Sequence, residues 1–212
     1  NNPVTVGQPI PGLQIRLGDM EELQVKGPTV MKGYWKRPDA TAEVFTEDGW
    51  FKTGDQADLS DAGRIRIKGR IKEIIVTSTG EKIPPTDMEL AIQTDPLFEQ
   101  VMVVGEARPF ITALAVVNEA EWEKFAKEFN VDPTDERMLM RRDIRMAALK
   151  RLKKAASRFP QYGIPRNIRL LKEHWTVDNG CLTVTMKLRR PIIREKLRAE
   201  IDELYTVPQN NV

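Results

Sequence analysis

The sequence predicts an α+β protein in which a small all-β subdomain, residues 1–70, precedes an α/β domain, residues 74–212. In the first part apolar and polar residues alternate, and eight glycines before residue 64 favour short strands and loops. In the second part apolar residues recur at helical spacing between apolar runs of strand length. The pattern changes at residues 71–73, which we expect to form a hinge.

Short strands account for the first part. Apolar residues alternate with polar ones at 13–17 and again at 23–26, on either side of a Gly18-Asp19 turn, which predicts a hairpin with one buried face. The alternation returns at 64–68, after the turn residues 60–63. We therefore expect residues 1–70 to contain strands and loops but no helix.

The second part alternates between strands and helices. Thr86 and Glu89 have the spacing of a capping box, which predicts a helix that ends near Asp95-Pro96. Asn118, with Glu121 three residues later, predicts the start of an amphipathic helix. Apolar spacing, together with Pro191 as a first helical residue, predicts the remaining elements: strands at 74–76, 101–104, 111–117 and 168–170, and helices at 135–159 and 191–204.

The composition excludes several classes of protein. The 33 basic and 31 acidic residues leave a net charge of +2, which argues against nucleic-acid binding driven by bulk charge. A single cysteine and a single histidine exclude a disulfide framework and a cysteine- or histidine-rich metal site, so we assign no metal ligands and interpret His174 and Cys181 as structural. The longest apolar run, 111–117, is far shorter than a membrane span. We expect a cytoplasmic protein, and the start at Asn1 without methionine suggests a fragment of a longer chain.

The first stretch that indicates chemistry is Gly33-Tyr34-Trp35-Lys36-Arg37-Pro38-Asp39-Ala40-Thr41, followed by Asp48-Gly49-Trp50-Phe51-Lys52-Thr53-Gly54-Asp55. Its glycines and aromatic residues predict turns that deliver one carboxylate, Asp55, to a strand-to-loop junction. A carboxylate there can accept two hydrogen bonds from a cis-diol such as a ribose. Considered alone, Asp55 fits a turn-capping role better than a ligand-binding one.

The second stretch runs from Gly69 to Pro85. Arg70 is a permanent cation suited to oxygen-rich ligands, and the small residues of Thr77-Ser78-Thr79-Gly80 let the backbone approach a ligand closely. A hairpin with solvated cations is the alternative. The third stretch, Gly180 to Arg190, places Lys187 among hydroxyls before a helix, where a lysine can stabilise a transferring phosphoryl group or simply be solvated.

Taken together and in this order, the three stretches resemble the adenylate-forming (AMP-binding) superfamily. The run Asn179-Gly180…Leu182-Thr183…Thr185…Lys187…Arg189-Arg190, after Phe159-Pro160-Gln161-Tyr162, is most similar to bacterial long-chain fatty acid–CoA ligases. The resemblance covers essentially the whole chain. Two positions depart from the common pattern: Met186 replaces a glycine, and Val76 stands where many relatives have a lysine used in thioester formation.

The resemblance implies a role for each matching residue. Asp55 would hold the ribose hydroxyls of ATP and acyl-AMP, and Arg70 would contact the nucleotide. Lys72 would lie at the hinge about which the C-terminal domain swings. Gly80 would lie in the hairpin that lines the channel for the pantetheine arm of CoA, and Lys187 would reach the α-phosphate and the carboxylate during adenylation.

The reaction implied has two steps: a fatty carboxylate and Mg-ATP give acyl-AMP, and coenzyme A then displaces AMP. Neither the Thr-Ser-Gly-Thr-Thr-Gly-type phosphate loop nor the Tyr-Gly-x-Thr-Glu segment occurs in these residues, so we expect the Mg²⁺ ligands and the acyl pocket in a missing N-terminal region. Residues 1–70 would be the last subdomain of the large domain, and 74–212 the mobile C-terminal domain of the acyl-CoA synthetase type. The fragment alone is expected to be inactive.

Two alternatives stay open. One is an acyl-AMP ligase that passes its acyl group to a carrier protein. The other is a non-catalytic module, because residues 137–158 contain nine basic residues and one acidic residue. On a helix this segment would dock on anionic lipid at the inner membrane face, attract the phosphates of coenzyme A, or form a solvated face. Nucleic-acid binding is disfavoured, since no aromatic stacking platform accompanies the basic residues. The oligomeric state and acyl chain length are not encoded in any of these patterns.

Overall fold

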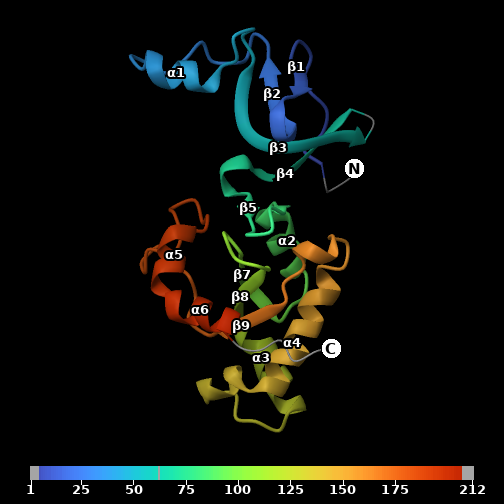
Figure 1. Ribbon diagram of the computed structural model, residues 1–212, viewed down its shortest axis with the longest axis vertical. Helices are drawn as coiled ribbons and strands as arrows, with labels where there is room; N and C mark the ends of the chain where they lie inside the picture. The colour runs from blue at the N-terminus through green and yellow to red at the C-terminus, as the bar shows by residue number, and fades with distance from the viewer. Residues whose placement is uncertain (1–4, 62, 207–212) are drawn as a thin grey trace. The chain divides into compact units, whose positions relative to one another are not determined.

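The chain divides into two compact units, Asn1–Ile74 and Ile75–Val212. The structure is a computed structural model that describes residues 5–61 and 63–206 (Figure 1). The division falls one residue after the segment 71–73 that the sequence indicates as a hinge. Motion about this segment stays a prediction, and each unit is described by itself.

The first unit is built on a four-stranded antiparallel sheet whose strands follow chain order. The strands are β1 (Gln14–Leu17), β2 (Glu22–Lys26), β3 (Phe51–Asp61) and β4 (Arg64–Arg70). The predicted hairpin is confirmed, with Leu17 opposite Leu23 and the short 3₁₀ helix η1 (Asp19–Glu21) in its turn. Leu23, Ala57 and Ile65 form a small core on one face of the sheet.

The expectation that residues 1–70 contain no helix is wrong. Helix α1 (Pro38–Val44) begins at a proline, which suits the first helical position because its missing N–H needs no partner there. The glycines and prolines that favour loops flank this segment, whereas Ala40, Ala42 and Glu43 within it are adequate helix formers. A second turn of 3₁₀ helix, η2 (Ile71–Glu73), follows β4.

The second unit contains a three-stranded sheet and a short hairpin. In the sheet, β7 (Phe98–Val104) pairs antiparallel with β8 (Thr112–Val117), and β8 pairs in parallel with β9 (Asn167–Leu171). The hairpin joins β5 (Ile75–Val76) to β6 (Lys82–Ile83). Every residue of β8 is buried, because helices cover both faces of the sheet.

The two faces of the sheet support two separate cores. On one face, α2 (Pro85–Ile92), α3 (Glu119–Glu128) and α4 (Arg142–Ala155) pack against side chains such as Val101, Val103 and Ala115. On the other face, α5 (Arg190–Lys196) and α6 (Arg198–Thr206) pack against Met102, Leu114 and Val116. Figure 1 shows α5 and α6 on the opposite side of the strands from α2 and α4. This arrangement confirms the predicted α+β class.

Helix starts were predicted with mixed success. Asn118 caps α3 as expected, since its side chain accepts a hydrogen bond from the Glu121 N–H. The Thr86 capping box is wrong: α2 begins at Pro85 after Pro84 with no side-chain cap. The Glu89 carboxylate is instead directed inward, where it accepts a hydrogen bond from the Val103 N–H at 2.8 Å.

Two predicted helices are interrupted. The segment 135–159 consists of the 3₁₀ helix η3 (Glu136–Met140) and α4, separated at Arg141, whose ψ of 132° is not helical. The segment 191–204 divides into α5, which begins at Arg190, and α6, because Leu197 leaves helical geometry. Apolar residues continue at helical spacing across both breaks, so their periodicity does not reveal a change of backbone direction. A last 3₁₀ turn, η4 (Gln161–Gly163), precedes β9.

Candidate functional site

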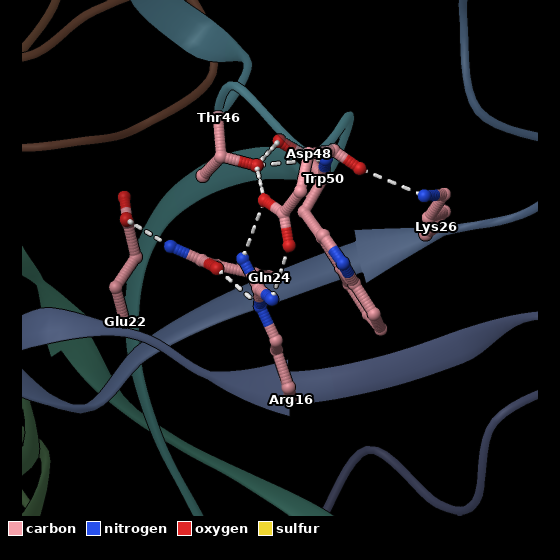
Figure 2. Close-up of polar contacts among 7 residues, drawn as sticks. All are labelled: Arg16, Glu22, Gln24, Lys26, Thr46, Asp48 and Trp50. Carbon is pink, nitrogen blue, oxygen red and sulfur yellow. Dashed lines mark hydrogen bonds and ion pairs between the residues drawn. The ribbon is translucent and has the colours of Figure 1, made fainter.

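The segment that leads into β3 is braced by a polar network. Thr46 donates a hydrogen bond from its hydroxyl to the Asp48 carboxylate at 2.7 Å and accepts one from the Trp50 N–H at 2.9 Å. Gly49 provides the positive φ of +81° that the turn requires. The Asp48 carboxylate accepts two hydrogen bonds from the Arg16 guanidinium, at 2.7 and 3.0 Å (Figure 2).

Arg16 links this turn to the β1–β2 hairpin. Its Nε donates to the Gln24 side-chain oxygen at 2.8 Å, and its guanidinium lies 4.5 Å from the centre of the Trp50 ring (Figure 2). The hydrogen bond from Arg16, with a second from Thr46, lowers the pKa of Asp48 from 3.8 to about 2. Asp48 and Trp50 are thus occupied with the turn itself, although they belong to the motif that ends in Asp55.

Asp55 lies directly opposite Arg70 across the β3–β4 pair. One Arg70 nitrogen is 2.9 Å from Asp55 Oδ1 and also donates to the Thr53 carbonyl at 3.3 Å. Asp55 Oδ2 makes no hydrogen bond within residues 5–61 and 63–206, so it is available as an acceptor. The sheet therefore brings together the two residues that the sequence indicates for nucleotide binding, a carboxylate and a guanidinium.

The glycine- and aromatic-rich segment before α1 is a tight turn. The Tyr34 N–H donates to the Thr41 hydroxyl at 2.9 Å, and that hydroxyl donates to the Arg37 carbonyl at 2.7 Å. Gly33 lies against Thr41 so closely that a Cβ would come within 2.7 Å of it. Trp35 is 87% exposed at the edge of an open cleft of about 610 Å³.

Lys72 lies in η2 at the end of the first unit, and its side chain is exposed. The turn is closed by a hydrogen bond from the Ile74 N–H to the Ile71 carbonyl. Gly80 lies in the second unit, in the turn of the β5–β6 hairpin, with a φ of +83°. Nothing lies within 4 Å of the position that a Cβ would occupy on Gly80, so this turn presents an open backbone surface.

Lys187 lies in an exposed loop with a well-defined stem. Leu182 pairs with Leu188, and the Thr183 N–H donates to the Lys187 carbonyl at 2.9 Å. Met186 has a φ of +60°, a conformation that glycine adopts most easily, which accounts for a glycine at this position of the pattern. The Lys187 ammonium makes no hydrogen bond or ion pair with any described residue, so its charge is available to a ligand.

Sequence reasoning missed the interaction of Glu89 with Arg190. The Arg190 guanidinium donates to both oxygens of Glu89, at 2.6 and 2.7 Å, and the two side chains are only 17% and 7% exposed. Arg190 ends the third stretch singled out above and Glu89 follows the second by four residues, but 101 positions separate the two. Their proximity follows from the sheet topology, which no local pattern reveals.

The remaining sequence-predicted residues are distributed over the second unit. Cys181 is buried, whereas His174 is exposed, with its Nε2 3.2 Å from the Glu99 carboxylate. Its neighbour Trp175 occupies the core instead. No three acidic, histidine or cysteine side chains converge on a metal-sized site in the described part of the chain. None of the helices there has the length and apolar character that a bilayer-spanning helix needs.

Five of the nine basic residues in 137–158 have polar partners in the described part of the chain, one of them Arg158, which donates to the Asp87 carbonyl at 3.5 Å. Arg137 pairs with Asp135, Arg141 with Asp143 and Arg151 with Asp95, and Arg145 donates to Asn167. Three lysines on α4 are exposed and make no hydrogen bond or ion pair with a described residue: Lys150, Lys153 and Lys154.

Known proteins resemble this chain over most of its length. It is 38% identical over 209 residues to the long-chain-fatty-acid–CoA ligase FadD15 of Mycobacterium tuberculosis, covering 95% of this chain and 34% of that protein. It is 31% identical over 223 residues to the chloroplastic long-chain-fatty-acid–acyl-carrier-protein ligase AEE15 of Arabidopsis thaliana, covering 95% of this chain and 29% of that protein. The chain thus spans about a third of the length of these curated relatives.

Solved structures and the family model agree with these relatives. The A-PCP didomain of carboxylic acid reductase from Segniliparus rugosus, in complex with AMP, superposes with a TM-score of 0.71 at 28% identity. The match covers 87% of this chain and 24% of that one. The family model described as the AMP-binding enzyme C-terminal domain matches residues 72–208. By this match the chain belongs to the AMP-binding enzyme C-terminal domain family, as the three motifs led us to expect.

Proposed function

We propose that this chain is the C-terminal part of an ATP-dependent fatty acid–CoA ligase, which forms acyl-AMP and then acyl-CoA. The relative with 38% identity is a long-chain-fatty-acid–CoA ligase, and residues 72–208 match the C-terminal domain of AMP-binding enzymes. In the first step a carboxylate oxygen attacks the α-phosphorus of ATP and pyrophosphate leaves. In the second step the CoA thiolate attacks the acyl carbonyl carbon and AMP leaves.

The observation that carries this proposal is the state of Lys187. Its ammonium is exposed on a braced loop and has no partner within the described ranges, 5–61 and 63–206. A cation held in this way can neutralise the negative charge that develops while pyrophosphate departs. Lysine suits this task as a compact charge on a flexible stem, whereas arginine has a different shape and reach.

Asp55 and Arg70 would hold the nucleotide during both steps. Asp55 Oδ2 would accept hydrogen bonds from the ribose hydroxyls while Oδ1 remains bound to Arg70, which fixes the orientation of the carboxylate. The second unit would then swing about Lys72 and present the Gly80 turn to the pantetheine arm of CoA. Mg²⁺ would accompany ATP, although the described residues offer no cluster of ligands for it.

Lys187→Ala tests the proposal in the enzyme that carries this chain. ATP–pyrophosphate exchange should fall by about 10²–10³-fold, because one electrostatic contact to the developing charge is lost. Transfer from preformed acyl-AMP to CoA should stay close to wild type, since Lys187 would act only before the swing. Lys127→Ala, which removes an exposed lysine of the same unit to which no role is assigned, should leave both rates unchanged. Equal loss of both half-reactions in Lys187→Ala would contradict the assigned role.

The acyl acceptor is the point on which the relatives differ. The Arabidopsis protein at 31% identity is a ligase for the acyl carrier protein, whereas the mycobacterial protein at 38% is a CoA ligase. We infer CoA for this chain from the higher identity. Release of AMP that depends on added CoA supports this choice. Release that depends on holo-acyl-carrier-protein alone favours the second acceptor.

We also propose peripheral contact of α4 with an anionic membrane surface. Lys150, Lys153 and Lys154 support this contact because their charges are exposed and make no hydrogen bond or ion pair among the described residues. Flotation with vesicles that contain phosphatidylserine, compared with phosphatidylcholine alone, tests it. Substitution of the three lysines by glutamine should abolish any difference between the two vesicle types.

A further inference from the structure

The second unit contains a buried ion pair, between Glu89 and Arg190, to which the proposed function assigns no role. Its two parallel hydrogen bonds, 2.6 and 2.7 Å long, have the geometry that gives an arginine–carboxylate pair its directional specificity. Glu89 Oε1 also accepts a hydrogen bond from the Val103 N–H at 2.8 Å. The carboxylate thus joins α2, β7 and the first residue of α5 at one buried point.

Arg190 is closely connected to the loop that carries Lys187. It follows the stem of that loop, in which Leu188 pairs with Leu182 and the Arg189 N–H donates to the Cys181 carbonyl at 2.8 Å. Among the described residues, the tip of the loop is held by contacts within the loop, such as the hydrogen bond from the Lys187 N–H to the Thr183 hydroxyl at 3.1 Å. The direction in which the loop leaves the unit is therefore set at the stem and at Arg190.

The Gly80 hairpin is held by different contacts, although α2 follows it directly. The Val76 N–H donates to Glu106 at 3.1 Å, and the Ser78 N–H donates to the Arg108 carbonyl at 3.0 Å. Thr77 closes the turn through its hydroxyl, which accepts from the Glu81 N–H. None of these hydrogen bonds involves Glu89 or Arg190, so the hairpin has its own support.

We propose that the Glu89–Arg190 ion pair positions the Lys187 loop for the adenylation step and is not required for the thioester step. Both residues are positioning residues, since they act through Lys187 and touch no substrate themselves. The inference rests on the proposed function of Lys187. It adds that the position of the Lys187 side chain depends on the Glu89 carboxylate in α2, which is distant from Lys187 in the sequence.

The test measures the two half-reactions separately in the enzyme that carries this chain. Arg190→Gln should lower ATP–pyrophosphate exchange by about 10–100-fold, because a misplaced catalytic group loses rate steeply, while transfer from acyl-AMP to CoA stays within about twofold. Arg190→Lys should recover part of the loss, since it restores the charge without the bidentate geometry. In a Lys187→Ala background, Arg190→Gln should cause no further loss of exchange, because the lysine through which it acts is gone.

A double variant distinguishes the loss of positioning from a general loss of folding. Arg190→Gln leaves the Glu89 charge buried without its partner, whereas Glu89→Gln/Arg190→Gln removes both charges and keeps an acceptor for the Val103 N–H. The double variant should show the same selective loss of exchange. Arg151→Gln is the matched control, because it breaks a similar bidentate pair with Asp95, at 2.9 and 2.6 Å, and should not distinguish the two half-reactions.

The possible failures can be told apart. The positioning role is overturned if Arg190→Gln and Glu89→Gln/Arg190→Gln each lose exchange and transfer equally. It is also overturned if Arg190→Gln lowers exchange further in the Lys187→Ala background. Either result leaves the proposed role of Lys187 intact. Unchanged exchange in Lys187→Ala itself overturns the proposed function, and the positioning role with it. Selective loss that disappears in the Lys187→Ala background supports the inference.

Discussion

Asp48 illustrates, at the scale of one residue, how an exposed carboxylate holds a turn in place. Arg16 and Thr46 both donate hydrogen bonds to its charged form, and they lower its pKa to about 2. A pKa that lies below its ordinary value of 3.8 means that folding favours the charged form. The stabilisation is therefore complete above about pH 4 and is lost as the pH falls through about 2.

Asp48→Asn should destabilise the first unit at pH 7, and the difference from wild type should shrink between pH 4 and pH 2. Urea unfolding midpoints measured across this range at low ionic strength check the expectation, since salt screens an exposed pair. Glu47→Gln is the control, because Glu47 makes no hydrogen bond or ion pair within the described chain. A difference that is independent of pH would assign the effect to shape and not to charge.

At the residue scale, the sequence predicted candidate side chains for the chemistry but not how those side chains meet. Asp55 and Arg70 were both predicted as nucleotide-binding residues, but their contact depends on the register of β3 and β4. That register shifts at irregularities beside Gln56 and after Asp58. Such bulges have no reliable local signature, because one extra residue changes which side chains face each other. The link between Glu89 and Arg190 depends on topology and was missed for that reason.

At the scale of elements, helix starts show which capping signals are reliable. Asn118 offers a side-chain acceptor, which the Glu121 N–H uses, and Trp122 and Phe125 then point into the core. The competing signal at Thr86 failed, because α2 already begins at Pro85, directly after the extended Pro84, so Thr86 lies inside the helix and does not cap it. Breaks at Arg141 and Leu197 escaped detection, since apolar spacing continues through them.

Asn118→Ala should lower the free energy of unfolding of the second unit by about 1 kcal/mol, because the Glu121 N–H loses its acceptor. Hydrogen exchange at the Glu121 amide should accelerate as the first turn of α3 frays. Asn118→Ser, which keeps a side-chain acceptor, should lose much less. If the two variants lose equally, the contact of the Asn118 amide with Glu99, and not the cap, accounts for the effect.

At the scale of the whole molecule, the chain divides into two units between Ile74 and Ile75. The sequence predicted a change of character at 71–73 because strand alternation stops there and helical spacing begins. The sequence does not reveal whether the units move about this segment, because such motion depends on contacts that composition does not specify. The swing about Lys72 is therefore proposed from the family resemblance.

Lys72→Pro tests this swing in the enzyme that carries the chain. Proline fixes φ and removes a donor, so one orientation of the second unit should be lost, and one half-reaction should survive while the other falls sharply. Lys72→Ala, which alters the side chain but leaves the backbone free, should retain both. ATP–pyrophosphate exchange and acyl-AMP-to-CoA transfer, measured side by side, distinguish the outcomes. Equal loss in the proline variant would place the hinge elsewhere.

The parallel pairing of β8 with β9 has a consequence for how this protein is made. β8 (Thr112–Val117) is apolar after its first residue, Thr112, and its second neighbour, β9 (Asn167–Leu171), is translated only after α3 and α4. While the ribosome synthesises the residues in between, β8 is an unpaired apolar edge of the kind that templates aggregation. We therefore expect the nascent chain to depend most on chaperones after β8 has emerged from the ribosome and before β9 has. This dependence ends when β9 pairs with the exposed edge of β8.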